Sequence, residues 1–420
     1  MTRIPFYKPS IGAEEIDEVV DTLKSGWLTT GPKTKRFEAE FAAYLSQKEA
    51  VAVNSCTAAL HLALEAIGLK AGEGVIVPTM TFAATAEVVR YFGARPILVD
   101  CRQADLNLDV ADAERKIESA LVRGQSVRAI IPVHYGGQMG DVHGVRTLAK
   151  RYNLKVVEDA AHCCPAFYRE PAEALTGNGN HGSDWRPVGT DADISCYSFY
   201  ANKTITTGEG GMACTNNQEY AERMRVMALH GISKDAWKRF TAEGSWYYEI
   251  IAPGFKYNLT DIAAAIGLHQ LRKADVFHKR RSTAAAWYRE KLRDVEEVIL
   301  PETQTDRVHS WHLYVIRLRL ERLKIDRAQF ISALKERGIG TSVHWMPLHM
   351  HPYYRETYGY VPEDLPTACR LYPEIITLPL YPDMTEEEVS EVCEAIRQIV
   401  VSNLRGTGAN VRTLFGLTVN

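Results

Sequence analysis

Lys203 stands in a segment whose composition suits covalent chemistry. Residues 198–211 read Ser-Phe-Tyr-Ala-Asn-Lys-Thr-Ile-Thr-Thr-Gly-Glu-Gly-Gly, so hydroxyl side chains flank the lysine and glycines that permit close approach of a ligand follow it. Most lysines lie at the protein surface. However, desolvation or a neighbouring charge lowers the pKa of the amine and makes it a nucleophile toward aldehydes. Because Lys203 follows a predicted strand, a pocket at the end of that strand can supply this environment, and Lys203 is a candidate nucleophile toward an aldehyde.

Asp159 ends the apolar run Lys-Val-Val-Glu-Asp at residues 155–159. A carboxylate buried at this point is costly unless a positive group lies beside it. A protonated pyridine nitrogen is such a group, and the carboxylate in turn keeps that nitrogen protonated so that the ring can act as an electron sink. The alternative role for Asp159 is to cap the turn that follows the strand.

Residues 54–57, Asn-Ser-Cys-Thr, lead directly into the helical pattern of residues 58–65. Unpaired backbone N–H groups and hydroxyls therefore gather at one helix N-terminus, which is a typical site for an anion such as a phosphate. The alternative is ordinary N-capping of the helix by Ser55 or Thr57.

Short apolar runs alternate with helical patterns between residues 50 and 215, as in parallel sheets with crossover helices. In such sheets ligands bind outside the carboxyl ends of the strands. Strands are expected at residues 51–53, 75–77, 97–99, 129–133, 155–157, 194–197 and 211–214. The side chains directly after them that could do chemistry are Asn54, Ser55, Thr57, Phe82, His134, Asp159, His162, Ser198 and Lys203.

The length of 420 residues exceeds what one hydrophobic core usually supports. We expect a large α/β domain at residues 12–270 and a small α+β domain formed by residues 271–420 with the N-terminal segment 1–11. A long helical pattern covers residues 260–292, with Thr260 or Asp261 able to cap it. Residues 168–189 read as a surface loop, and the residues after 403 have weak periodicity.

Composition excludes several classes of protein. A net charge of -3 argues against a nucleic-acid partner, and without a long apolar stretch or a signal peptide the sequence predicts a cytoplasmic protein that does not bind a membrane. The eight cysteines form no CxxC pair and are expected to be reduced. The spacing of His344, His349 and His351 fits no familiar zinc pattern, so no metal is expected. Substrate contact is the preferred role for His344 and for His309.

Ordered motifs along nearly the whole chain resemble the DegT/DnrJ/EryC1/StrS family of sugar aminotransferases that depend on pyridoxal phosphate. They lie at residues 25–32, 78–85, 131–136, 158–162, 206–211, 254–261, 310–316 and 338–344. The resemblance implies PLP fold type I, like that of aspartate aminotransferase, with a mostly parallel seven-stranded sheet. It also implies a homodimer with composite active sites.

The roles that the resemblance implies for individual residues all concern the cofactor. Lys203 forms the Schiff base and shuttles protons, Asp159 pairs with the pyridine nitrogen, and His162 faces the ring oxygen. The positions that match phosphate or ring contacts are Thr57, the backbone at Ala58, Ser198, the stacking side chain of Phe82, and Asn258 from the neighbouring subunit. Thr30, in the first motif, is a further substrate candidate.

Two residues depart from the family pattern, since Tyr200 replaces a common His and Cys56 replaces a common Gly or Ala. The retained Lys203 argues against the related dehydratases, which have His there. The implied reaction transfers the amino group of L-glutamate to a keto sugar. The motifs look closest to enzymes that aminate the sugar 4-position, such as the UDP-4-amino-4-deoxy-L-arabinose synthases of lipid A modification.

Other functions stay open at this point. Within the family, a 3-keto sugar or a cyclitol of the scyllo-inosose type is the main alternative substrate. Outside it, a silent regulator with a PLP fold or a metal hydrolase is conceivable, but a scaffold needs neither Lys203 nor Asp159.

Overall fold

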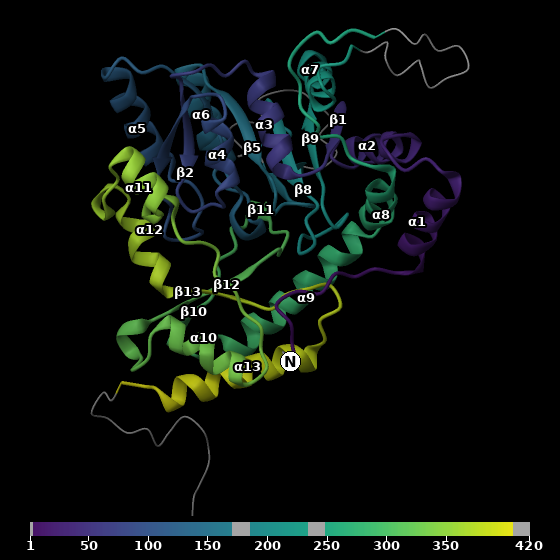
Figure 1. Ribbon diagram of the computed structural model, residues 1–420. Helices are drawn as coiled ribbons and strands as arrows, with labels where there is room; N and C mark the ends of the chain where they lie inside the picture. The colour runs from purple at the N-terminus through teal and green to yellow at the C-terminus, as the bar shows by residue number, and fades with distance from the viewer. Residues whose placement is uncertain (1–2, 170–184, 234–247, 406–420) are drawn as a thin grey trace, which may run out of the picture.

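The computed structural model describes residues 3–169, 185–233 and 248–405 (Figure 1). Its centre is a seven-stranded sheet in the order β1-β9-β8-β5-β4-β2-β3. All neighbouring pairs are parallel except the two that involve β9, which confirms the mostly parallel sheet expected from the sequence. The strands are β1 (Glu49–Val53), β2 (Gly74–Pro78), β3 (Arg95–Val99), β4 (Val127–Ile130), β5 (Lys155–Asp159), β8 (Ile194–Ser198) and β9 (Gly211–Thr215).

Helices cover both faces of this sheet, which is why several of its strands carry apolar residues in sequence rather than in alternation with polar ones. In β2, Val75 and Val77 pack with α3 (Cys56–Ala66) and α4 (Ala84–Arg90), among others. Ile76 points to the opposite face, where α5 (Val110–Val122) and α6 (Val142–Tyr152) contribute the neighbouring apolar side chains. At the β1 end, that opposite face is covered by α2 (Pro32–Tyr44) and α8 (Asp261–Arg272), and α7 (Gln218–Ala228) joins the α3 side.

The C-terminal part forms a separate hydrophobic cluster around a small antiparallel sheet in the order β10-β12-β13. Its main elements are α9 (Ala274–Leu292), β10 (Val298–Ile299), β12 (Tyr314–Leu318), α10 (Arg327–Glu336), β13 (Ile375–Leu378) and α13 (Glu386–Ser402). Ile4 belongs to the same cluster and pairs with Ile339. These contacts support the proposed union of the N-terminal segment with the small domain, while Ala274 and Phe277 of α9 still pack with the large one.

Two expectations about secondary structure need correction. The helical pattern of residues 260–292 is two helices, α8 and α9, which meet at Lys273 (φ −95°, ψ −2°). The ends of the predicted loop at 168–189 form paired strands, β6 (Phe167–Arg169) and β7 (Trp185–Pro187), which β11 (Arg307–Val308) extends. The rest of that loop and the predicted tail from residue 406 lie outside the described residues.

Thr260 is the N-cap of α8, since its hydroxyl accepts from the Ala263 N–H at 3.3 Å. Asp261 has a different function: its buried carboxylate accepts from the backbone N–H groups of Gly31 (2.8 Å) and Thr34 (2.9 Å) at the start of α2. It therefore caps a helix from another part of the chain, and α2 has no capping side chain of its own. This contact joins the motifs at residues 25–32 and 254–261.

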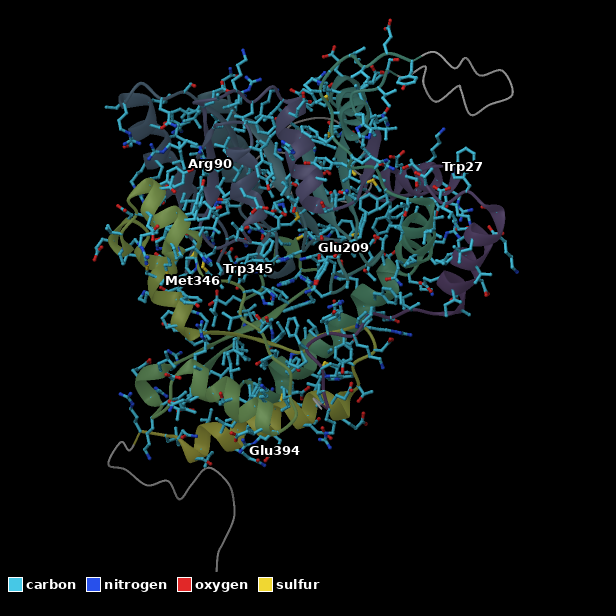
Figure 2. All side chains as sticks on the ribbon, in the orientation of Figure 1. Trp27, Arg90, Glu209, Trp345, Met346 and Glu394 are labelled. Atoms are coloured by element: carbon cyan, nitrogen blue, oxygen red, sulfur yellow. The ribbon has the colours of Figure 1, made fainter. Side chains whose placement is uncertain are left out.

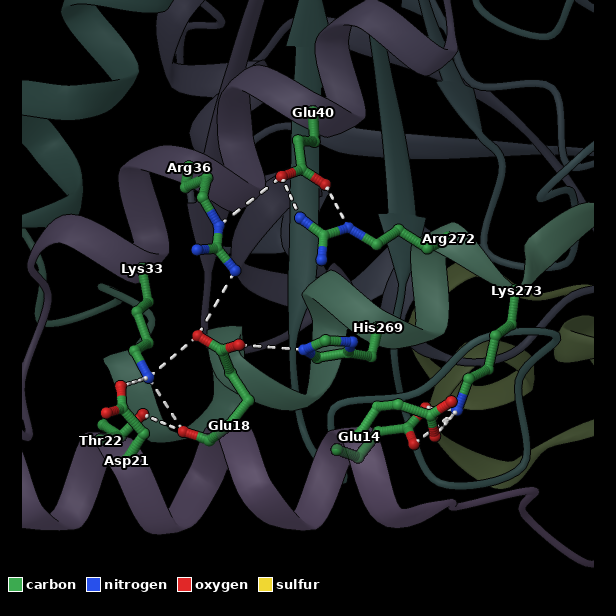
Figure 3. Close-up of polar contacts among 11 residues, drawn as sticks. Glu14, Glu18, Asp21, Thr22, Lys33, Arg36, Glu40, His269, Arg272 and Lys273 are labelled. Atoms are coloured by element: carbon green, nitrogen blue, oxygen red, sulfur yellow. Dashed lines mark hydrogen bonds and ion pairs between the residues drawn. The ribbon is translucent and has the colours of Figure 1, made fainter.

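An ion network joins α1 (Ala13–Ser25), α2 and α8 (Figure 3). Glu18 is its centre, with oxygens 3.0 Å from Lys33 Nζ, 3.3 Å from Arg36 and 3.0 Å from His269 Nε2. Although partial burial opposes the change, hydrogen bonds from His269 and Lys33 and the nearby positive charges lower the pKa of Glu18 to about 2. The network therefore joins α1 to α2 and α8, the helices that cover the large sheet, through ion pairs and hydrogen bonds of Glu18.

Candidate active site

Lys203 lies in the turn that follows β8, at the carboxyl edge of the large sheet. Its backbone N–H donates to Tyr200 O at 2.9 Å, and Gly208 (φ +81°) allows the chain to turn back toward β9. Burial lowers the pKa of Lys203 to about 8, although the Cys56 and Asp159 side chains oppose that shift. About a tenth of the amine is therefore unprotonated at pH 7, far more than for an exposed lysine, and this is the form that acts as a nucleophile.

Asp159 is buried at the end of β5, and each of its oxygens accepts one hydrogen bond. Oδ2 accepts from Thr85 Oγ1 at 2.8 Å, and Oδ1 accepts from the Ala161 N–H at 3.2 Å. The second bond is the turn-capping contact that was the alternative role for this residue. Burial raises the pKa of Asp159, while Thr85, Ala161 and the charge of Lys203 act in the opposite direction. The Asp159 carboxylate thus caps the turn, and its charge also interacts with that of Lys203.

His162 is a buried, neutral imidazole of defined tautomer. The Gly136 N–H donates to its Nδ1 at 3.2 Å, so the ring proton lies on Nε2. Burial and the charge of Lys203 hold the pKa of His162 well below its usual range. The ring stacks on Trp345 with centroids 5.1 Å apart and contacts His312 at 4.3 Å. Figure 2 shows Trp345 between the large sheet and the small C-terminal sheet.

The N-terminus of α3 lies beside β9 at the same edge. Ser55 is its N-cap, with the Ala58 N–H donating to Ser55 Oγ at 3.1 Å. The capping role therefore belongs to Ser55, and the Thr57 hydroxyl makes no hydrogen bond within the described ranges. A Cβ at Gly211 would lie 2.5 Å from the carbonyl of Ser55, so only glycine permits this close approach. The Ser198 hydroxyl, at the end of β8, accepts from the Tyr200 N–H at 3.3 Å.

Asn258 pairs with Val53 in a β-bridge directly before the turn at residues 54–57 of the same chain. Its amide donates to Thr30 Oγ1 at 2.7 Å, and the Thr30 hydroxyl donates to the Leu259 carbonyl. The Thr30 hydroxyl is thus used within the protein. The substrate role of Thr30 and the role of Asn258 across a subunit boundary both stay predictions.

The two histidines expected to contact substrate lie in different surroundings. Burial, with the charge of Lys203, lowers the pKa of His344 to about 4, and its Nδ1 is 2.8 Å from Thr377 Oγ1. His309 instead stacks on Trp311 at 4.0 Å, and burial together with His278 lowers its pKa to about 3. The structure therefore places His344, and not His309, in the electrostatic environment of Lys203.

Three side chains near Lys203 or its neighbours were missed as site residues by sequence reasoning, namely Thr85, His312 and Trp345. Thr85 and His312 lie inside motifs that carry the family resemblance, and Trp345 follows another directly, so a signal was present. None of the three directly follows a strand of the large sheet, and residues in that position were the ones that the strand pattern selected as candidates for the site.

The histidines considered for a metal do not assemble into a site. His349 is 2.8 Å from Thr79 Oγ1 and 2.9 Å from Cys369 Sγ. Across residues 3–169, 185–233 and 248–405, no three His, Cys, Asp or Glu side chains gather in a way that could hold a metal ion. The same ranges contain no helix long and apolar enough to cross a membrane.

The arrangement fits pyridoxal phosphate, because each part of that molecule has a chemically suitable neighbour. The amine of Lys203 suits the aldehyde, the carboxylate of Asp159 suits the ring nitrogen, and the Nε2–H of His162 suits the ring oxygen. The start of α3 suits the phosphate. Phe82, which follows β2 and is 60% exposed, is an aromatic side chain of the kind that stacks on such a ring.

Comparisons with known proteins agree with this chemistry. A model of the DegT/DnrJ/EryC1/StrS aminotransferase family matches residues 9–397. The spore coat polysaccharide biosynthesis protein SpsC of Bacillus subtilis is 43% identical over 398 residues, which cover 94% of this chain and 97% of SpsC.

Solved structures show the same fold. A putative sugar aminotransferase of Streptococcus pneumoniae, solved in PLP, PMP and apo forms, has a TM-score of 0.84 at 31% identity for its PMP form, covering 95% of this chain and 100% of the other. Helicobacter pylori PseC, an aminotransferase of pseudoaminic acid biosynthesis, has a TM-score of 0.82 at 27% identity, covering 95% and 99%. The chain therefore belongs to the DegT/DnrJ/EryC1/StrS aminotransferase family and is a sugar aminotransferase that depends on pyridoxal phosphate.

Proposed function

We propose that this enzyme moves the amino group of L-glutamate to the 4-keto group of a nucleotide-linked hexose or pentose. The observation that carries the proposal is the buried Lys203 amine, with a pKa lowered to about 8, at the same sheet edge as the buried carboxylate of Asp159. The names of SpsC and PseC, which refer to polysaccharide and pseudoaminic acid biosynthesis, support a role in making surface polysaccharide or lipopolysaccharide.

In this proposal the bound cofactor supplies an electron sink for the carbon that loses or gains a proton. Lys203 would hold the cofactor through its aldehyde group, and the same amine, when free, would take up and return the proton that moves in the reaction. A pKa of about 8 suits both directions, because a group with a pKa near the working pH serves as acid and as base. Asp159 holds the proton on the ring nitrogen, and His162 donates its Nε2–H to the ring oxygen.

The remaining cofactor contacts belong to the same proposal. Thr57, the backbone at Ala58 and Ser198 bind the phosphate, and the side chain of Phe82 stacks on the ring. Asn258 reaches the phosphate of a partner subunit. His344 contacts the substrate, because it shares the electrostatic environment of Lys203.

We further propose a cytoplasmic homodimer with composite active sites. Large apolar side chains stand exposed near the sheet edge that carries Lys203 and in the segment before residues 254–261. They include Phe82, Tyr200, Ile250 and Ile251, the last two exposed by 67% and 57%. Exposed apolar groups of this kind are typical of subunit interfaces. Sedimentation equilibrium that gives only the monomer mass at micromolar concentration would contradict this part of the proposal.

The test of substrate is product analysis with L-glutamate and a panel of UDP-, dTDP- and GDP-linked 4-keto sugars. Release of 2-oxoglutarate together with a 4-amino sugar is expected. A 3-keto sugar and scyllo-inosose belong in the panel as matched alternatives. Faster turnover of either would overturn the 4-keto assignment but not the reaction class.

A further inference from the structure

Two buried threonines form a hydroxyl chain that ends on Asp159. Thr81 Oγ1 lies 2.8 Å from Thr85 Oγ1, and Thr85 Oγ1 lies 2.8 Å from Asp159 Oδ2. Both threonines are at most 2% exposed, so water does not compete for these bonds. Thr85 lies in the first turn of α4, and Thr81 lies in the segment that leads from β2 into this helix, three residues before the helix begins.

The direction of donation along this row of hydroxyl groups follows from the number of hydrogens that each group can donate. An ionised carboxylate only accepts, and a hydroxyl has a single hydrogen to donate. Thr85 therefore donates to Asp159 and must accept from Thr81. Bonds arranged in one direction polarise one another, and a hydrogen bond to a charged acceptor is worth more than one between neutral groups.

Asp159 has few other sources of stabilisation. Burial favours its neutral form, and the bond from Thr85 is the largest of the effects that oppose this, ahead of the Ala161 N–H and the charges of Lys203 and His134. Because each oxygen already accepts one bond, the carboxylate cannot rotate without losing a donor. We propose that Thr85, backed by Thr81, is a positioning residue that keeps Asp159 ionised and fixes its orientation toward the cofactor's ring nitrogen.

This inference rests on the proposed roles of Asp159 and Phe82. The burial of the residues in segment 78–85 explains how this segment can contribute to both roles. Phe82 lies between the two threonines in sequence, but it is 60% exposed whereas they are buried. The segment therefore turns the hydroxyls of Thr81 and Thr85 inward to the carboxylate and leaves the aromatic ring of Phe82 exposed. The same short segment would supply both the stacking side chain and the support for the carboxylate that pairs with the ring nitrogen.

The experiment uses the holoenzyme loaded with pyridoxal phosphate that carries 15N in the ring. The 15N chemical shift reports whether the ring nitrogen is protonated, and it is independent of turnover. In Thr85→Val, which keeps the volume but removes the donor, the signal is expected to move toward the unprotonated value, and cofactor affinity is expected to fall about tenfold. Thr85→Ser restores the donor and should restore the wild-type shift, and Thr81→Val should move it in the same direction by less.

Thr79→Val is the matched control, because Thr79 is buried in the same segment but its hydroxyl contacts His349 instead of Asp159. This variant should keep the wild-type 15N shift even where its thermal stability falls. An unchanged signal in Thr85→Val, or an equal change in Thr79→Val, would overturn the positioning role. Wild-type enzyme that shows no visible absorbance band after addition of pyridoxal phosphate would instead overturn the proposed covalent role of Lys203.

Discussion

Two regions of the molecule place a carboxylate near a lysine and a histidine, but the pKa values of the charged groups move in opposite directions. In the network of α1, α2 and α8, Glu18 contacts Lys33, Arg36 and His269 at the edge of solvent, and the pKa of Glu18 falls to about 2. At the end of β5, burial raises the pKa of Asp159 and lowers that of Lys203 to about 8.

The difference shows that access to water and the number of partners decide whether a charged pair keeps its protonation state or can change it. Glu18 has two positive neighbours, Lys33 and Arg36, accepts a hydrogen bond from His269 and retains some hydration, so its charge is stable and serves to hold helices together. Asp159 and Lys203 lose hydration and have few partners, so both lie closer to a change of protonation. The first arrangement suits structure, and the second suits proton transfer.

The largest effect is expected from Lys203→Ala, which removes the nucleophile and the base at once. Turnover should fall by at least about a thousandfold in an assay of 2-oxoglutarate release. Lys33→Ala, in the ion network, is the matched control and should retain turnover per folded molecule. Full activity in Lys203→Ala would refute the catalytic role of Lys203. Equal losses in both variants would show that the two regions do not differ in their importance for turnover.

Asp159→Asn should come next, with turnover lower by about a hundredfold, because a neutral amide no longer holds the proton on the ring nitrogen. The same change should not lower the unfolding free energy of the cofactor-free enzyme, since burial disfavours the charge that it removes. Urea unfolding measures this. A cofactor-free variant that is clearly less stable than wild type would show that the Asp159 carboxylate stabilises the fold, as Glu18 does in the ion network.

Lys203→Met should stabilise the cofactor-free enzyme by about 2 kcal/mol at pH 7, where wild type must bury a charged amine. Because the pKa of Lys203 is lowered from 10.5 to about 8, the unfolded chain binds the extra proton between these values. Wild-type stability should therefore rise with pH across this window, and the advantage of the variant should vanish above it. An advantage that does not change with pH would mean that charge burial is not the cause.

The smallest effect is expected from Glu18→Gln, with a loss of about 1 kcal/mol at neutral pH and unchanged turnover. The pKa of Glu18 is lowered from 4.5 to about 2, so its contribution is present above pH 4.5 and is lost as the pH falls toward 2. Acid unfolding monitored by circular dichroism should show wild type and variant converging in that range. Parallel curves would indicate that Glu18 acts through packing rather than charge.

Sequence reasoning proposed Lys203, Asp159 and His162 as site residues because each lies at the end of an apolar strand or directly after it, at the edge where parallel sheets bind ligands. It also predicted the seven strands and the capping turn at residues 54–57. It joined α8 and α9 into one helix, because the 3.6-residue pattern continues through Lys273, where the two helices meet. It treated residues 168–189 as loop, because short strand pairs such as β6 and β7 leave little periodicity.

The sequence by itself determined the class of fold and the cofactor, and it led to the prediction of Lys203 as the lysine that binds it, because strand patterns and local motifs involve residues that are close together in the sequence. Only the tertiary structure showed that Thr85 donates to Asp159, that His312 packs on His162, and that His344 rather than His309 shares the environment of Lys203. Those contacts join segments 74 to 150 positions apart in the chain. Their distances and the loss of water around them exist only once the chain has folded.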